Sequence, residues 1–128
     1  SRLRELIIMR LAWRAGSDYA WFQHYRIATT QCGVTSEEIV AVRDWRASNL
    51  FGAAERAVLA AADDTTEHGK ISKAVWAECE KELKEPAVLV EMVVAIGNWT
   101  MFAQLLNSLE VEIEEGATPW PPDGKAPN

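Results

Sequence analysis

The sequence predicts an all-α fold, a compact bundle of about six helices. Apolar residues recur at three- and four-residue spacing along most of the chain. Residues typical of helix caps separate these segments, and no segment alternates apolar and polar residues as a strand does. A length of 128 residues with 48% hydrophobic content suffices for one domain with a buried core. We therefore expect a single helical domain.

The first two helices are predicted to form a hairpin. The first covers about residues 2–15 and ends at Gly16, which suits the left-handed conformation that often follows a helix. Ser17 or Asp18 can cap the second helix, which reaches about Cys32. Because the connection is so short, the two helices should pack against each other.

Two further helices are predicted in the middle of the chain. Thr35 and Glu38 match a capping box, which predicts a short helix to about Arg46. The alanine-rich segment 49–67 should form the next helix and end near Gly69.

The last two helices are also indicated by their first residues. Ser72 can cap a helix that runs to about Lys84. Pro86 suits the first turn of a long final helix that reaches about Ser108.

The domain is expected to cover residues 1–116, followed by a proline-rich tail over residues 117–128. The tail has too few apolar residues to offset the entropy of ordering, except for Trp120, which could dock on a neighbouring surface. The abrupt helical start at Ser1 suggests that an earlier helix precedes it.

Charge and composition exclude several classes of partner. The net charge of −6 repels nucleic-acid phosphates and anionic lipid, so we expect no nucleic-acid or membrane partner. The most apolar stretch, residues 87–97, contains Glu91 and is shorter than the roughly 20 residues of a membrane span. Cys32 and Cys79 stand alone in the sequence, which favours a reducing, cytoplasmic setting. A chain this small with a very apolar helix is expected to form a homo-oligomer.

Two ionisable residues stand on otherwise apolar helix faces. Glu5 shares its face with Ile8 and Met9, and desolvation there should raise its pKa towards the range of a general acid or base. His24 follows Trp21 on a similar face of the second helix. The hairpin allows Glu5 and His24 to meet, since they lie at comparable distances from its turn.

Structural roles are the alternative for each of these residues. Glu5 could pair at the surface with Arg2, with Arg4 or with an arginine of a partner. A lone histidine on an apolar face is more often a hydrogen-bonded core residue than a catalyst. The aromatic residues could line a pocket or fill the core: Trp13, Tyr19, Trp21, Tyr25 and Trp99. A metal site needs three or four converging ligands, so we expect no metal and no cofactor.

The segment 4–24 resembles the signature helix pair of the carboxymuconolactone decarboxylase and alkylhydroperoxidase D-like superfamily. The similarity continues through "AERAVLAAADDTTEHG" within residues 50–69 and "WTMFAQLLNSLEVEIEEG" at residues 99–116. It covers about 110 residues and implies the helical fold of that superfamily.

The resemblance also implies roles for the two polar residues. In the peroxidase branch, a glutamate is followed by two cysteines and a histidine, and the matching positions here are Glu5, Ser17, Ala20 and His24. The proton-relay residues are therefore present, whereas a hydroxyl and a methyl group replace the redox pair and cannot exchange disulfides. Peroxiredoxin-type activity is not expected, and a peroxidase that uses Cys32 or Cys79 instead is the least favoured alternative.

The decarboxylase branch requires no cysteine pair. The resemblance thus implies a cofactor-free acid-base enzyme, a lyase that acts on a small carboxylated or carbonyl substrate with Glu5 and His24 as its catalytic residues. The residues expected to bind the substrate are Ser17, Tyr19, Trp21, Arg14 and Trp99, and Arg10 is a further candidate for holding a carboxylate. The alternative is a catalytically silent helical oligomer or binding subunit in which Glu5 and His24 form only a buried pair.

Overall fold

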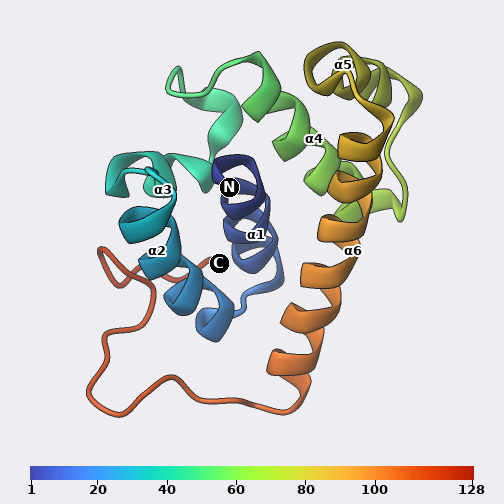
Figure 1. The fold of residues 1–128 in the computed structure, drawn as a ribbon. Helices are drawn as coiled ribbons and strands as arrows, with labels where there is room; N and C mark the ends of the chain where they lie inside the picture. Colours follow the sequence, from blue (N-terminus) through green and yellow to red (C-terminus); the bar gives the residue numbers. More distant parts are fainter.

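The computed structural model describes all 128 residues and confirms the all-α class (Figure 1). Six α-helices and one short 3-10 helix follow one another along the chain. They are α1 (Arg2–Ala15), α2 (Asp18–Gln31), α3 (Ser36–Val42), η1 (Trp45–Ala47), α4 (Ala53–His68), α5 (Lys73–Leu83) and α6 (Pro86–Ser108).

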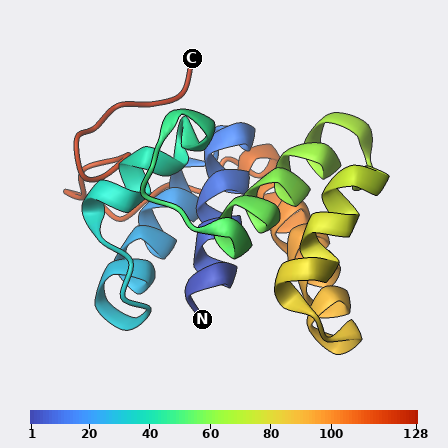
Figure 2. The same ribbon diagram turned by 90° about the horizontal axis from the view of Figure 1, so that it is seen from above.

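Helix α1 lies at the centre of the bundle. Figures 1 and 2 show α2 and α3 on one side of it and α4, α5 and α6 on the other. Leu6 and Met9 of α1 belong to a core cluster shared with α2 and α3, while Ile7 and Leu11 belong to a second cluster shared with α4, α5 and α6. Because α1 is buried on two sides, any polar residue it carries inward is shielded from water.

The α1–α2 hairpin forms as the sequence predicts. Gly16 adopts a left-handed φ of 65°, and the backbone N–H of Ser17 donates to the carbonyl of Ala12 at 2.9 Å. The Ser17 hydroxyl then accepts a hydrogen bond from the N–H of Ala20 and caps α2. The turn thereby fixes the register in which the two helices face each other.

Two helix boundaries in the middle of the chain differ from the prediction. The capping box of Thr35 and Glu38 is present, but α3 ends at Val42, and the chain then turns so that Trp45 of η1 is buried. Helix α4 begins only at Ala53, because the Glu55 carboxylate accepts from the N–H of Gly52 at 2.9 Å and caps the helix there. Long-range burial and a local cap set these boundaries.

The last twenty residues contain no helix, yet they are anchored to the bundle. Trp120 is only 8% exposed and packs against Trp13 and Trp21, with ring centroids 5.7 and 5.8 Å away. The indole N–H of Trp21 donates to the carbonyl of Pro121 at 2.6 Å. Trp120 therefore docks on the bundle, and the low apolar content of residues 117–128 does not prevent it.

Helix α6 is more apolar than the sequence analysis indicated. By length and composition alone it could span a membrane, and 22% of its most apolar window is buried in this fold. Leu89, Met92, Ile96 and Ala103 face the core. The opposite face exposes several valines and larger apolar side chains.

Candidate functional site

The α1–α2 hairpin brings Glu5 and His24 into direct contact. The Nδ1 atom of His24 lies 2.8 Å from Oε1 of Glu5. Glu5 is only 1% exposed, and its second carboxylate oxygen accepts from Nε of Arg4 at 3.2 Å. Glu5 and His24 therefore meet, as the predicted hairpin allows, and they form one hydrogen-bonded pair.

The pKa of Glu5 is shifted in the opposite direction to the one the sequence suggested. Burial raises the pKa of its carboxyl group, but the hydrogen bond to His24, the charge of that ring and Arg4 together outweigh burial. The net effect lowers the pKa of Glu5 below its usual value of 4.5. Glu5 is therefore held as a carboxylate, and the expectation of a raised pKa was wrong because it counted desolvation without the partners.

His24 lines a cavity of about 300 Å³ between α2 and α6. The cavity walls are mainly aromatic and aliphatic, and they comprise Tyr19, Ala20, Gln23, Trp99, Phe102 and Leu106. The edge of His24 meets Trp99 at a centroid separation of 6.0 Å and an angle of 90°. Since Nδ1 is occupied by Glu5, Nε2 is the ring nitrogen left for a molecule in the cavity.

The predicted substrate-binding residues divide into two groups. Tyr19 and Trp99 lie in the wall of this cavity beside His24. Ser17 is fully buried as the cap of α2, and Trp21 is fully buried in the core. Ser17 and Trp21 therefore support the hairpin and do not face the cavity.

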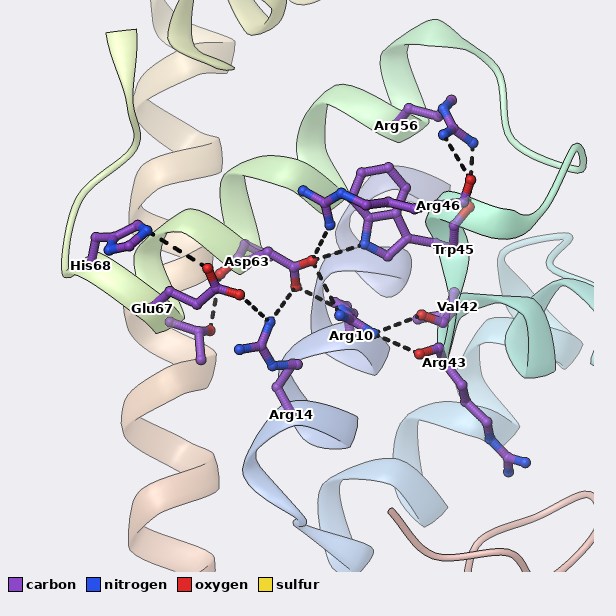
Figure 3. A network of polar contacts seen from close by, with 12 residues as sticks. Arg10, Arg14, Val42, Arg43, Trp45, Arg46, Arg56, Asp63, Glu67 and His68 are labelled. Carbon is purple, nitrogen blue, oxygen red and sulfur yellow. Dashed lines mark hydrogen bonds and ion pairs between the residues drawn. The ribbon is translucent and has the colours of Figure 1, made fainter. Parts of the chain in front are cut away.

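The two arginines proposed to hold a substrate carboxylate lie elsewhere. Nε of Arg10 donates to Asp63 at 2.7 Å, and Arg14 pairs with both Asp63 and Glu67 at 3.2 Å (Figure 3). Both guanidinium groups are neutralised on the α4 side of α1. Arg4 is instead the arginine that contacts the Glu5–His24 pair.

Asp63 is the buried charge that the sequence analysis missed. It is 2% exposed and accepts hydrogen bonds from Arg10, Arg46 and the indole of Trp45, as Figure 3 shows. Burial raises its pKa, but these donors lower it by more. The spacing rule that identified Glu5 would have identified Asp63, because Leu59 and Ala60 precede it by four and three residues.

The cysteines do not form a redox pair. Cys79 is fully buried, and burial together with nearby carboxylates raises the pKa of its thiol to about 11. Cys32 is half-buried, and both cysteines are free. No group of three or more His, Cys, Asp or Glu side chains is placed to hold a metal ion.

The fold and the paired residues define an all-α helical protein with a buried glutamate–histidine pair, and Ser17 and Ala20 lie between these two residues in the sequence. A model of the carboxymuconolactone decarboxylase family matches residues 1–64, and the chain belongs to this family. These residues include both Glu5 and His24.

A solved structure supports the fold over most of the chain. It is a protein of unknown function from Agrobacterium tumefaciens, named as a candidate antioxidant defence protein AhpD. It superposes with a TM-score of 0.81 at 20% sequence identity, covering 88% of this chain and 77% of the other. Comparison with curated proteins gives no match.

Proposed function

We propose that the protein is a cofactor-free acid-base enzyme in which His24 transfers a proton to or from a small carbonyl or carboxylated substrate. The observation that carries the proposal is the 2.8 Å contact between Glu5 and His24, with His24 in the wall of an apolar cavity. Membership of the carboxymuconolactone decarboxylase family supports a decarboxylation as the reaction.

The geometry supports different roles for the two residues. Glu5 is too deeply buried to touch a substrate, so it is a positioning residue. Its carboxylate accepts the Nδ1–H of His24, which selects the tautomer with a lone pair on Nε2 and stabilises the ring when that nitrogen gains a proton. His24 is the catalytic residue, because its ring lines the cavity.

A decarboxylation balances with this pair alone. The bond between the carboxylate carbon and its neighbour breaks, and its electron pair passes to a conjugated carbonyl as CO₂ leaves. Nε2 of His24 first takes the proton of the substrate's carboxylic acid group, and it returns that proton to the carbanion that remains after CO₂ leaves. No arginine or lysine lines the cavity, and an apolar wall disfavours a bound carboxylate more than the uncharged CO₂ it releases.

The test uses carboxymuconolactone, with CO₂ release as the readout, and small β-keto acids as a parallel set of probes. We expect wild-type turnover on at least one probe and a loss of about 10²–10⁴-fold in kcat for His24→Ala. Glu5→Gln should lower kcat with little change in KM, because Glu5 does not touch the substrate. Tyr25→Phe is the matched control, since Tyr25 neighbours His24 but bonds Ser36 outside the cavity.

The competing function is a silent assembly or binding subunit, which the exposed apolar face of α6 favours. In that case Glu5→Gln and His24→Ala would chiefly lower the melting temperature, because each leaves a buried polar partner unsatisfied. Near-normal turnover in both variants would exclude the acid-base proposal.

A further inference from the structure

A cavity of about 580 Å³ lies between η1, α4 and α5, and it has no residue in common with the cavity beside His24. We call it the Trp45 cavity, after the indole in its wall. The apolar part of the wall consists mainly of short side chains, among them Ala53, Ala57, Ala60 and Ala74. Because these side chains are short, they leave open the space that longer ones would fill. The alanine-rich sequence of α4 therefore shapes a cavity as well as favouring a helix.

The wall of the Trp45 cavity also carries two arginines that stack on Trp45. The guanidinium carbon of Arg46 lies 4.2 Å from the centre of the indole ring, and that of Arg56 lies 5.1 Å from it. Arg46 is 57% exposed, and Arg56 is half-buried. Since the indole already orders both side chains, a ligand that binds them costs little further side-chain entropy.

The charge of Arg56 is not neutralised by the hydrogen bonds that it makes within the chain. Its guanidinium group donates three hydrogen bonds, and all of them go to the main-chain carbonyls of Trp45, Arg46 and Ser48. These bonds use Nη1 and Nη2 and leave the Nε–H for another acceptor. Arg56 can therefore pair with the anionic group of a bound molecule.

Arg46 belongs to a network in which arginines outnumber carboxylates. It pairs with Asp63, which also pairs with Arg10 and Arg14, and Glu67 is the second carboxylate of the network (Figure 3). Three guanidinium groups thus share two carboxylates. Although the whole chain has a net charge of −6, this part of it is positive. Such a local excess of positive charge attracts an anion.

We propose that the Trp45 cavity binds a small organic monocarboxylate with a planar apolar body. The carboxylate accepts hydrogen bonds from Arg56 and Arg46, and the planar body lies on the alanine wall and against the guanidinium plane of Arg46. Glu78, on the α5 part of the wall, disfavours a second negative charge on the ligand. The volume is within the range of small-molecule sites. This site goes beyond the proposed acid-base function and does not depend on it.

The first experiment locates the ligand by two-dimensional NMR, with naphthoate as the probe. We expect saturable shifts of the amide signals of Ala57 and Ala74 and of the Nε–H signal of Arg56. Gln23, in the wall of the His24 cavity, should not shift. The neutral naphthyl methanol should bind about tenfold or more less tightly, because it cannot pair with the arginines. Saturable shifts confined to the His24 cavity, or equal affinities for the two probes, would overturn the proposal.

The second experiment measures the Kd of naphthoate by calorimetry in a variant that lacks the Arg56 charge. Arg56→Gln should raise the Kd about 10–100-fold, because a hydrogen bond to a charged group is lost. Arg26→Gln is the matched control, since Arg26 likewise has only a neutral partner, Gln23, but lies on α2. The control should bind as wild type does. An unchanged Kd for Arg56→Gln would rule out the pairing with Arg56.

A variant that fills the cavity keeps the proposal testable if Arg56→Gln does not fold. Ala74→Leu retains every charge but occupies part of the space, so it should weaken naphthoate binding about tenfold or more. Ala77→Leu makes the same change on the same helix outside the cavity wall and should leave the Kd unchanged. Both positions are exposed, so circular dichroism should show an unchanged helix content. If the two variants bound naphthoate equally well, the ligand would not occupy the Trp45 cavity.

A dicarboxylate tests the role of Glu78. Naphthalene dicarboxylate should bind less tightly than naphthoate to wild type, because its second charge meets the Glu78 side of the wall. Glu78→Gln should reduce this difference. Tighter binding of the dicarboxylate to wild type would contradict the assignment of a monocarboxylate.

Discussion

Asp63 shows how much of this small domain depends on single buried charges. It accepts hydrogen bonds from Arg10, Arg46 and Trp45, and Arg10 is itself only 11% exposed. Asp63→Asn removes the charge that neutralises these guanidinium groups. We expect it to reduce the free energy of unfolding by about 3–5 kcal/mol, as measured by urea denaturation.

The control for this prediction lies in the same network. Glu67 pairs with Arg14 but is 50% exposed, so Glu67→Gln makes the same chemical change where water screens the charge. Its effect should stay within about 1 kcal/mol. Equal unfolding midpoints for the two variants would show that the buried charge of Asp63 contributes no more to stability than the exposed charge of Glu67.

The two cysteines differ in burial, and we therefore expect them to differ in reactivity. Cys79 is fully buried and its pKa is raised to about 11, so almost none of it is thiolate at pH 8. Iodoacetamide should therefore modify Cys32 alone in the native protein, and Cys79 only after denaturation, as mass spectrometry of the peptides would reveal. Rapid native modification of Cys79 would contradict the burial on which this prediction depends.

Sequence reasoning recovered the central pair of residues but not their surroundings. Glu5 and His24 are identifiable because a charged or polar residue on an apolar face is conspicuous, and the Gly16 turn fixes the hairpin that joins them. Phe102 cannot be assigned to the cavity in this way, because its place beside His24 depends on how α6 crosses α2. The direction of the Glu5 pKa shift likewise depends on contacts that helix spacing does not specify.

At the level of elements, the C-terminal segment, residues 109–128, packs on α1 and α2, and we call it the strap. Trp120 packs against Trp13 and Trp21. Further along the same segment, Asp123 accepts two hydrogen bonds from Arg43. Trp120→Ala should lower the free energy of unfolding by about 3–5 kcal/mol while the helix content stays unchanged. Denaturation followed by circular dichroism measures both quantities.

An exposed residue of the same strap provides the comparison. Lys125→Ala changes a solvated side chain five residues away and should leave the unfolding midpoint within about 0.5 kcal/mol of wild type. If Trp120→Ala proved as mild as Lys125→Ala, the strap would not contribute to stability.

Most helix starts could be predicted from local cap residues. The Ser17, Thr35 and Ser72 caps and Pro86 each act through a local contact or a fixed backbone angle, and each marks the helix start seen in the structure. The end of α3 depends instead on burial of Trp45 beside Asp63, a residue eighteen positions away. Local caps therefore predicted most of the helices, whereas tertiary packing set the end of α3, and the start of α4 depends on the local cap of Gly52 and Glu55 that the prediction did not include.

For the molecule as a whole, the free energy of unfolding should decrease as the solution becomes acidic. Four carboxyl groups have pKa values below their ordinary ones: Glu5, Glu38, Asp63 and Asp123. A carboxyl group with a lower pKa in the folded state stabilises the fold above its unfolded pKa, and this contribution disappears as the pH falls through the folded value. The groups are spread over α1, α3, α4 and the tail, so their effects should combine in one transition.

The pKa of Glu38 sets the expected window, because its pairing with Arg2 lowers it from 4.5 to about 2. The urea midpoint should therefore decline as the pH falls from about 4.5 towards 2. Glu38→Gln removes one of these contributions at neutral pH and should flatten the decline, since no carboxyl group remains there to be protonated. If the urea midpoint of wild type held constant down to pH 3, the pKa values of these carboxyl groups would not be lower in the folded state than in the unfolded state.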